Sequence, residues 1–219
     1  MSSTTIKFSE FRFLVLSDLY RYKNGGGISN FISEYLFGIS FKYIFWFRLC
    51  QYLMQKGPLA YFPALVARIL LKNKSIKFGI DISLSTNIGP GLKIEHFGGI
   101  FVNGKAVIGM RCSILHDVTI GEYGGAPTIG NYVFIGPGAK IIGGVCIGDN
   151  VIIGANSVVT KHIPDNAVVV GIPGKIISEK GNLREKNKEQ VWQSTLGYFR
   201  EICPRSIWSK YGLDNQRRP

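Results

Sequence analysis

The chain has 219 residues, of which 46% are hydrophobic, with 26 Lys and Arg, 14 Asp and Glu, and four cysteines. This length allows one or two domains with a sizeable core, and the apolar content excludes a wholly disordered chain. The cysteines form no CxxC pair, so we expect neither a disulfide framework nor a metal site, and a reducing compartment fits best.

The net charge of +12 is concentrated at the two ends of the chain. Residues 1–77 carry 11 basic and 3 acidic side chains, residues 78–178 carry 6 of each, and residues 179–219 carry 9 and 5. Nucleic-acid binding would need a continuous basic surface with a recognisable reading module, and the sequence offers none, so no nucleic-acid partner is expected. A basic segment that is also aromatic suits an anionic ligand or an anionic membrane surface.

Residues 1–77 are predicted to form a helical N-terminal region. The first apolar stretch, at 11–16, is short and flanked by acidic residues, which argues against a secretion signal. The longer stretches at 35–53 and 58–71 are interrupted by basic residues, and a spanning helix needs about 20 apolar residues. We expect helices that cover the core or a subunit interface; peripheral contact with the inner membrane face is the alternative.

Residues 78–178 are predicted to form the main domain, because an aliphatic residue recurs there every six positions. The phase slips by two residues between Ile94 and Val102 and by three between Ile120 and Ile129. A period of six is neither that of a strand nor that of a helix, so it predicts short strands joined by tight turns and stacked in coils. The recurring positions are Ile82, Ile88, Ile94, Val102, Ile108, Ile114, Ile120, Ile129, Ile135, Ile141, Ile147, Ile153 and Val159.

Residues 179–219 form a polar tail that we expect to be helical. Its segment 187–201 is compatible with a helix that packs on the last coil.

The repeat resembles that of the hexapeptide-repeat acyltransferases, most closely the serine acetyltransferase branch. This resemblance implies a left-handed parallel β-helix with three hexads per coil and about four coils. It also implies acetyl-CoA as the acyl donor and a homotrimer with cofactor sites between subunits. The motifs that carry it are GIDI at 79–82, IGPGL at 88–92, EHFGGI at 95–100 and VVVGIPGK at 168–175.

Transfer of an acyl group from a thioester to an alcohol requires a general base, and histidine is the usual one. The resemblance assigns this role to His96, in the EHFGGI motif, and assigns the orientation of its imidazole to Asp81. His116 occupies the same place in its own hexad and follows His96 by 20 residues. This spacing predicts that the two histidines lie on neighbouring coils, so His116 could position a substrate or be the base itself.

The resemblance also supplies binding residues. Glu95 matches an acidic position that holds the amino acid in the serine enzymes. Pro137, Ala155 and Pro173 are spaced by 18 residues and are expected to line up along one edge. By motif, the cofactor-binding positions are Pro137, Ala155, Thr160, Lys161 and Lys175, and the two lysines could meet phosphates of CoA.

The chain departs from the serine enzymes in the loop 121–128, which has neither the Arg nor the His that holds the serine carboxylate there. The helical region is also shorter. These differences favour an O-acetyltransferase of capsule, exopolysaccharide or O-antigen synthesis, acting on a sugar or lipid-linked saccharide in the cytoplasm or at its membrane face. Glu95, His116 and Tyr123 would then contact sugar hydroxyls, and L-serine would be a poor acceptor. The alternatives are a serine O-acetyltransferase of cysteine synthesis and a non-catalytic β-helical scaffold.

Overall fold

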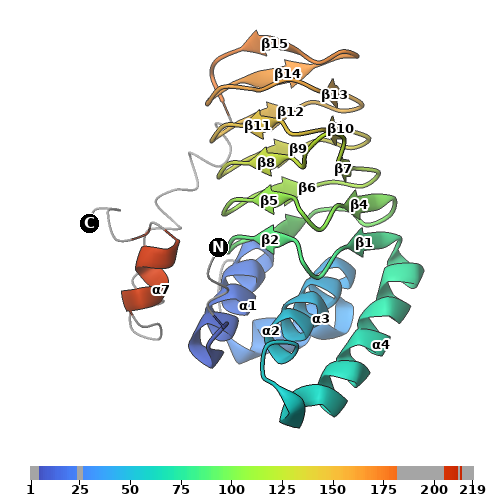
Figure 1. Cartoon of the computed structure of the whole chain (residues 1–219), viewed down its shortest axis with the longest axis vertical. Helices are drawn as coiled ribbons and strands as arrows, with labels where there is room; N and C mark the ends of the chain where they lie inside the picture. Colours follow the sequence, from blue (N-terminus) through green and yellow to red (C-terminus); the bar gives the residue numbers. More distant parts are fainter. Residues whose placement is uncertain (1–4, 24–26, 182–204, 212, 214–219) are drawn as a thin grey trace.

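The computed structural model describes residues 5–23, 27–181, 205–211 and 213. A layer of helices lies at one end of a three-sided β-helix, and the chain winds away from this layer coil by coil (Figure 1). The helices are α1 (Phe8–Lys23), α2 (Ile28–Phe37), α3 (Ile39–Leu53), the 3-10 turn η1 (Pro58–Ala60), α4 (Tyr61–Phe78) and α7 (Arg205–Lys210).

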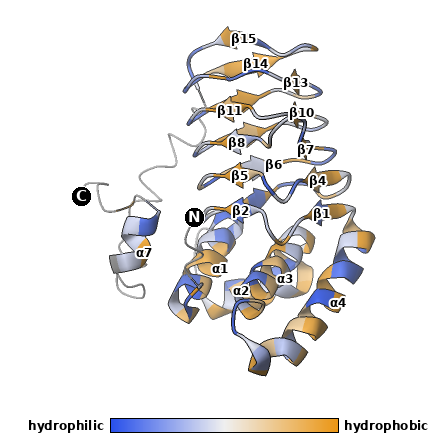
Figure 2. Cartoon of the chain, viewed as in Figure 1, coloured by the Kyte–Doolittle hydropathy of each residue, from blue (hydrophilic) through white to orange (hydrophobic). Residues whose placement is uncertain are grey.

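The helices of the N-terminal layer differ in how much they bury. Tyr43, Phe47 and Cys50 of α3 are fully buried and join the same core cluster as the β-helix. In α4 the buried residues are spaced at helical intervals along one side, from Ala64 to Phe78, so only this side packs inward. The opposite side of α4 leaves Phe62 and Ile69 more than half exposed, so the expectation of core-covering helices holds for α3 and only in part for α4 (Figure 2).

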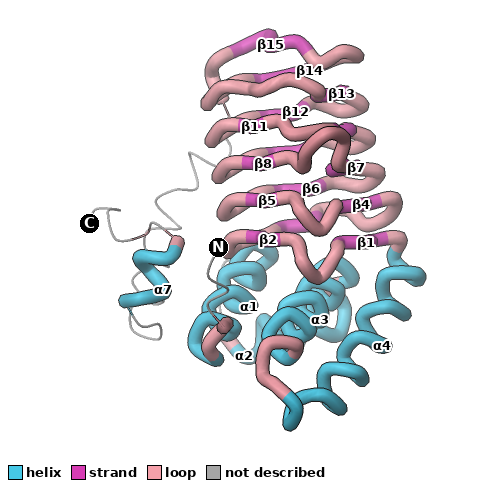
Figure 3. The backbone as a smooth tube through the Cα atoms, in the orientation of Figure 1, coloured by secondary structure: helices cyan, strands magenta, loops and turns pink. Residues whose placement is uncertain are grey.

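The β-helix is built from two- to four-residue strands joined by turns (Figure 3). The first face contains β1 (Ile80–Ile82), β4 (Ile100–Val102), β7 (Thr119–Gly121), β10 (Lys140–Ile142) and β13 (Val158–Val159). The second contains β2 (Asn87–Ile88), β5 (Val107–Ile108), β8 (Thr128–Ile129) and β11 (Cys146–Ile147). The third contains β3 (Lys93–Ile94), β6 (Ser113–Ile114), β9 (Phe134–Ile135), β12 (Ile152–Ile153), β14 (Val168–Val170) and β15 (Lys175–Ser178).

Every pair of neighbouring strands is parallel except the pair formed by β14 and β15, which is antiparallel. The recurring aliphatic residues are buried in a column along the axis, as the six-residue period predicts. The predicted left-handed parallel β-helix with a helical N-terminal segment is therefore confirmed.

The register along the third face shows where coils lengthen and shorten. Ile94 pairs with Ile114, Ile114 with Ile135, Ile135 with Ile153, and Ile153 with Val169. The spacing is therefore 20, 21, 18 and then 16 residues. The slips of two and three residues were predicted correctly, but the shortening of the last coil was not.

This shortening corrects one predicted alignment. Because Val169 lies opposite Ile153, the register places Gly171, and not Pro173, beside Ala155. The two missing residues fall before Ile163, which forms a bridge with Ile147 only 16 positions earlier. There the His162 Nδ1 accepts the Cys146 N–H at 2.9 Å, so a side chain replaces a backbone acceptor. Pro137 and Ala155 therefore share an edge, and Pro173 lies beyond it.

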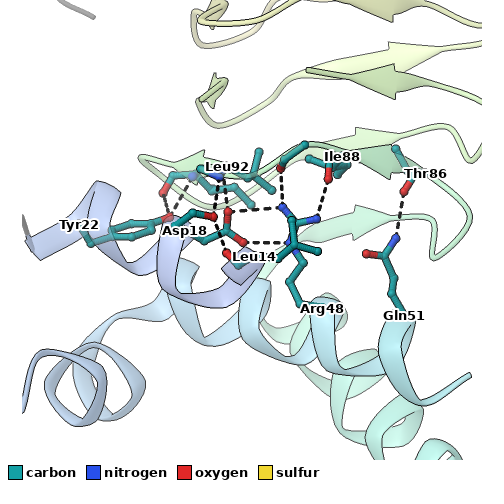
Figure 4. A network of polar contacts seen from close by, with 12 residues as sticks. Leu14, Asp18, Tyr22, Arg48, Gln51, Thr86, Ile88 and Leu92 are labelled. Atoms are coloured by element: carbon teal, nitrogen blue, oxygen red, sulfur yellow. Dashed lines mark hydrogen bonds and ion pairs between the residues drawn. The ribbon is translucent and has the colours of Figure 1, made fainter. Parts of the chain in front are cut away.

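Side chains of α1 and α3 close the open edge of the first coil (Figure 4). Arg48 donates to the carbonyl oxygens of Ile88 and Gly89, each at 2.7 Å, and Asp18 Oδ1 accepts the Leu92 N–H at 2.7 Å. The same two side chains form an ion pair of 2.9 Å, and each is about 99% or more buried. Burial raises the pKa of the Asp18 carboxyl, while Arg48 and the Leu92 N–H act in the opposite direction.

Aromatic hydroxyls and one amide complete this edge. The Tyr22 hydroxyl accepts the Ile94 N–H at 2.9 Å and donates to the Ile94 carbonyl at 3.0 Å. Tyr43, whose pKa is raised to about 12 chiefly by burial, accepts the Ile82 N–H. Gln51 donates to two carbonyl oxygens of the turn after β1. The helical layer thus provides the partners that a preceding coil would provide.

The C-terminal helix α7 packs against Phe13 of α1. It lies far from the last coil (Figure 1). Trp208 lies against Phe13, and Lys210 and Tyr211 both bind the buried carboxylate of Glu10. The segment 187–201, proposed above as a helix on the last coil, lies outside the described residues. Among the helices that the structure describes, none is both long and apolar enough to cross a membrane.

Candidate active site

The two histidines singled out in the sequence lie at the same corner of the β-helix. His96 follows β3 and His116 follows β6, and these strands pair with Ile94 opposite Ile114. The imidazole centroids are 6.0 Å apart with an angle of 73° between the ring planes, and both residues are exposed. The predicted placement on neighbouring coils is confirmed, and it gives the corner two groups that can exchange protons.

Two glycines let the chain make the widened corner beside His96. Gly98 and Gly99 have φ angles of 108° and 65°, in the region that favours glycine. A Cβ on Gly99 would lie 3.0 Å from the Cα of Asp117, so a side chain there would push against the next coil. The Gly98 carbonyl accepts the Asp117 N–H at 2.7 Å and fixes the corner to the next coil.

Asp81 lies on the strand beside this corner. It is the exposed middle residue of β1 and sits opposite Phe101, just after the corner that carries His96. Within residues 27–181, however, no hydrogen bond or ion pair joins the Asp81 carboxylate to either imidazole. Its orienting role therefore stays a prediction.

Two ion pairs lie next to the histidines. The Lys93 Nζ is 3.2 Å from Glu95 Oε1, and the Lys140 Nζ is 2.9 Å from Asp117 Oδ1. Neither Lys93 nor Asp117 was identified as a site residue from the sequence. The sequence signal that could have identified Lys93 is the alternation of side chains along an extended chain, which directs residues 93 and 95 to the same side of the sheet.

The remaining predicted residues are divided between corners of one chain. Pro137 and Ala155 follow β9 and β12 at the corner of the histidines. Tyr123, which is 83% exposed, follows β7, and Thr160 and Lys161 follow β13, so these three lie at the next corner. Lys175 begins β15 at the far end of the third face. One chain therefore does not bring Tyr123 to His96.

Comparisons with known proteins fit this geometry. Residues 126–161 match the bacterial transferase hexapeptide (six repeats) family. The chain is 39% identical to the serine acetyltransferase of Helicobacter pylori J99 over 119 residues, which is 52% of this chain and 70% of that protein. A crystal structure of the Brucella abortus serine acetyltransferase in complex with coenzyme A aligns with a TM-score of 0.68 and 33% identity, covering 80% of this chain and 70% of that one.

The chain belongs to the serine acetyltransferase family. Other relatives are longer: it is 39% identical to the Mycobacterium tuberculosis serine acetyltransferase over 137 residues, 60% of this chain but only 58% of that protein. These findings correct the assignment to capsule, exopolysaccharide or O-antigen synthesis. The absence of Arg and His from loop 121–128 was taken as evidence against serine, but the family relationship extends over most of the chain and supports the serine alternative.

Proposed function

We propose that this serine acetyltransferase homologue transfers the acetyl group of acetyl-CoA to the hydroxyl of L-serine. The observation that carries the proposal is the pair of exposed imidazoles at one corner of a β-helix of this family. In the proposed reaction His96 takes the hydroxyl proton as the serine oxygen attacks the thioester carbonyl. The tetrahedral intermediate then collapses to O-acetylserine and the CoA thiolate, which receives the proton. No covalent enzyme intermediate forms.

The other site residues have supporting roles in this proposal. Asp81 orients the imidazole of His96, and His116 contacts the acceptor or the thioester from the next coil. The Glu95 carboxylate, 29% exposed, suits the ammonium group of an amino acid. CoA contacts are assigned to Pro137, Ala155, Thr160, Lys161 and Lys175.

The division of these residues between two corners supports a homotrimer as part of the proposal. In a three-fold assembly of triangular prisms, the histidine corner of one chain can face the corner between the first and second faces of its neighbour. The residues at 121–128 and 160–161 would then complete a site begun by His96 and Ala155. Each site would lie between two subunits.

The proposal is tested by measuring CoA release by the purified full-length protein with acetyl-CoA and either L-serine or a panel of free and nucleotide-linked sugars. We expect kcat/KM for L-serine to exceed that for every sugar by at least ~100-fold, which corresponds to about 2.7 kcal/mol of transition-state binding. Turnover with a sugar and none with serine would refute it. Absence of turnover with all acceptors, in protein that is folded by circular dichroism, would favour a scaffold.

A further inference from the structure

The histidine corner contains a cation, Lys93, that has no role in the site described so far. The Lys93 Nζ lies 3.2 Å from the Glu95 carboxylate, and the two side chains are 24% and 29% exposed. The buried Ile94 stands between them in the strand, so both leave the sheet on its outer side. A half-buried positive and negative group thus stand together immediately before His96.

The helical layer holds this pair in place. The Tyr22 hydroxyl binds both backbone groups of Ile94, and the Lys93 ammonium lies 6.0 Å from the centroid of the Tyr22 ring. Partial burial strengthens the interaction of each charge with a ligand. Because an ion pair that is partly exposed contributes little to stability by itself, it can open for a ligand at small cost.

We infer that Lys93 and Glu95 together bind the two charges of an amino-acid acceptor, with Lys93 as the partner of its carboxylate. This inference rests on the proposed function. In L-serine the ammonium and the carboxylate are attached to one carbon, so opposite charges 3.2 Å apart on the protein match them. The ammonium meets Glu95, the carboxylate meets Lys93, and the hydroxyl is directed to His96. Lys93 therefore provides the cation that loop 121–128 lacks.

Other cations of the repeat are engaged differently. Lys140 binds both the carbonyl and the carboxylate of Asp117, one coil further from the helices. Lys105 pairs with Glu122 at another corner, 2.7 Å apart. Arg111 is 3% exposed and so is covered by the protein itself. Lys93 alone of these four adjoins the acidic residue that precedes His96.

The test compares Lys93→Met with wild type, using L-serine and L-serine amide, which keeps the ammonium and the hydroxyl but has no carboxylate. We expect Lys93→Met to raise KM for L-serine at least ~10-fold, the scale of a charge-assisted hydrogen bond, with kcat within about twofold. KM for L-serine amide and for acetyl-CoA should change less than twofold, and Lys93→Arg should restore most of the affinity for serine.

Lys56→Met is the matched control, because it removes a lysine that lies over an aromatic ring of the helical layer, 4.6 Å from the centroid of Tyr52, away from the histidine corner. It should keep the wild-type KM for serine. The inference is overturned if Lys93→Met, folded by circular dichroism, leaves KM for serine unchanged, raises it equally for the amide, or is exceeded by Lys56→Met. Failure of the wild-type enzyme to acetylate serine would instead refute the proposed function, so the two failures are distinguishable.

Discussion

His96 and His116 place two imidazoles within reach of one substrate, and mutation distinguishes their roles. We expect His96→Ala to lower kcat by at least ~100-fold, the usual contribution of a general base, and His116→Ala to lower it less. Steady-state CoA release with L-serine measures both. If His116→Ala abolished turnover while His96→Ala left it near wild type, the two assignments would be exchanged.

Asp81 affects the reaction only through the imidazole in this scheme. Asp81→Asn should therefore lower kcat by an amount between those of His116→Ala and His96→Ala, because it disturbs the orientation of the imidazole but leaves the base in place. An Asp81→Asn enzyme with unchanged kcat would show that the residue is only an exposed carboxylate of β1.

At the level of single residues, the sequence predicted the histidine corner because its spacing reports directly on coil register. It did not predict the partner of the acceptor carboxylate proposed here, because Lys93 is far from the loop that the family resemblance emphasises. The sequence also did not show that Tyr123 lies at a different corner of the same chain from His96. The repeat predicts how far along the axis a residue lies, whereas the corner that it occupies depends on its position within the three hexads of a coil.

The helical layer and the first coil are connected by the buried Arg48–Asp18 pair, which also binds backbone groups of the coil. Arg48→Met leaves the Asp18 carboxylate and two carbonyl oxygens without this partner. We expect a loss of about 3–5 kcal/mol in the free energy of unfolding, as for other broken buried pairs. Urea denaturation followed by circular dichroism measures it.

Lys105→Met is the control for this measurement, because it breaks an ion pair whose lysine is 73% exposed. Its expected cost is below ~1 kcal/mol. Equal stability of Arg48→Met and wild type would mean that the pair does not hold the layers together.

The elements of the β-helix were predictable and those of its ends were not. A strict period fixes strands because each aliphatic residue must reach the buried column. Which helical polar residues face a strand edge depends on tertiary packing, so the roles of Asp18, Arg48 and Tyr22 could not be derived. The shortened last coil was not predicted because the six-residue series ends at Val159, and the next buried aliphatic residue, Ile163, comes only four positions later.

For the whole molecule, we predict three chains per particle. Phe97 and Phe101 beside the histidine corner are each 45% exposed, which suits an apolar contact between prisms. Light scattering at micromolar concentration should give three times the chain mass of 24.3 kDa, or a multiple of that. A monomeric mass would contradict both the trimer and the sites proposed between its subunits.

The closed edge of the first coil also bears on self-association. At the opposite end of the prism the outermost strands β13 and β11 are already covered: the Val158 N–H donates to Gly171, its carbonyl accepts from Gly174, and Ile163 bridges Ile147. A fragment of residues 78–219, deprived of Tyr43, Arg48 and Gln51, would present unpaired strand edges at its first coil. Two such edges can pair with each other in a self-complementary contact that closes, so we expect this fragment to form particles with twice as many chains as those of the full-length protein, measured by light scattering. The helical layer would then act as a cap that prevents this doubling.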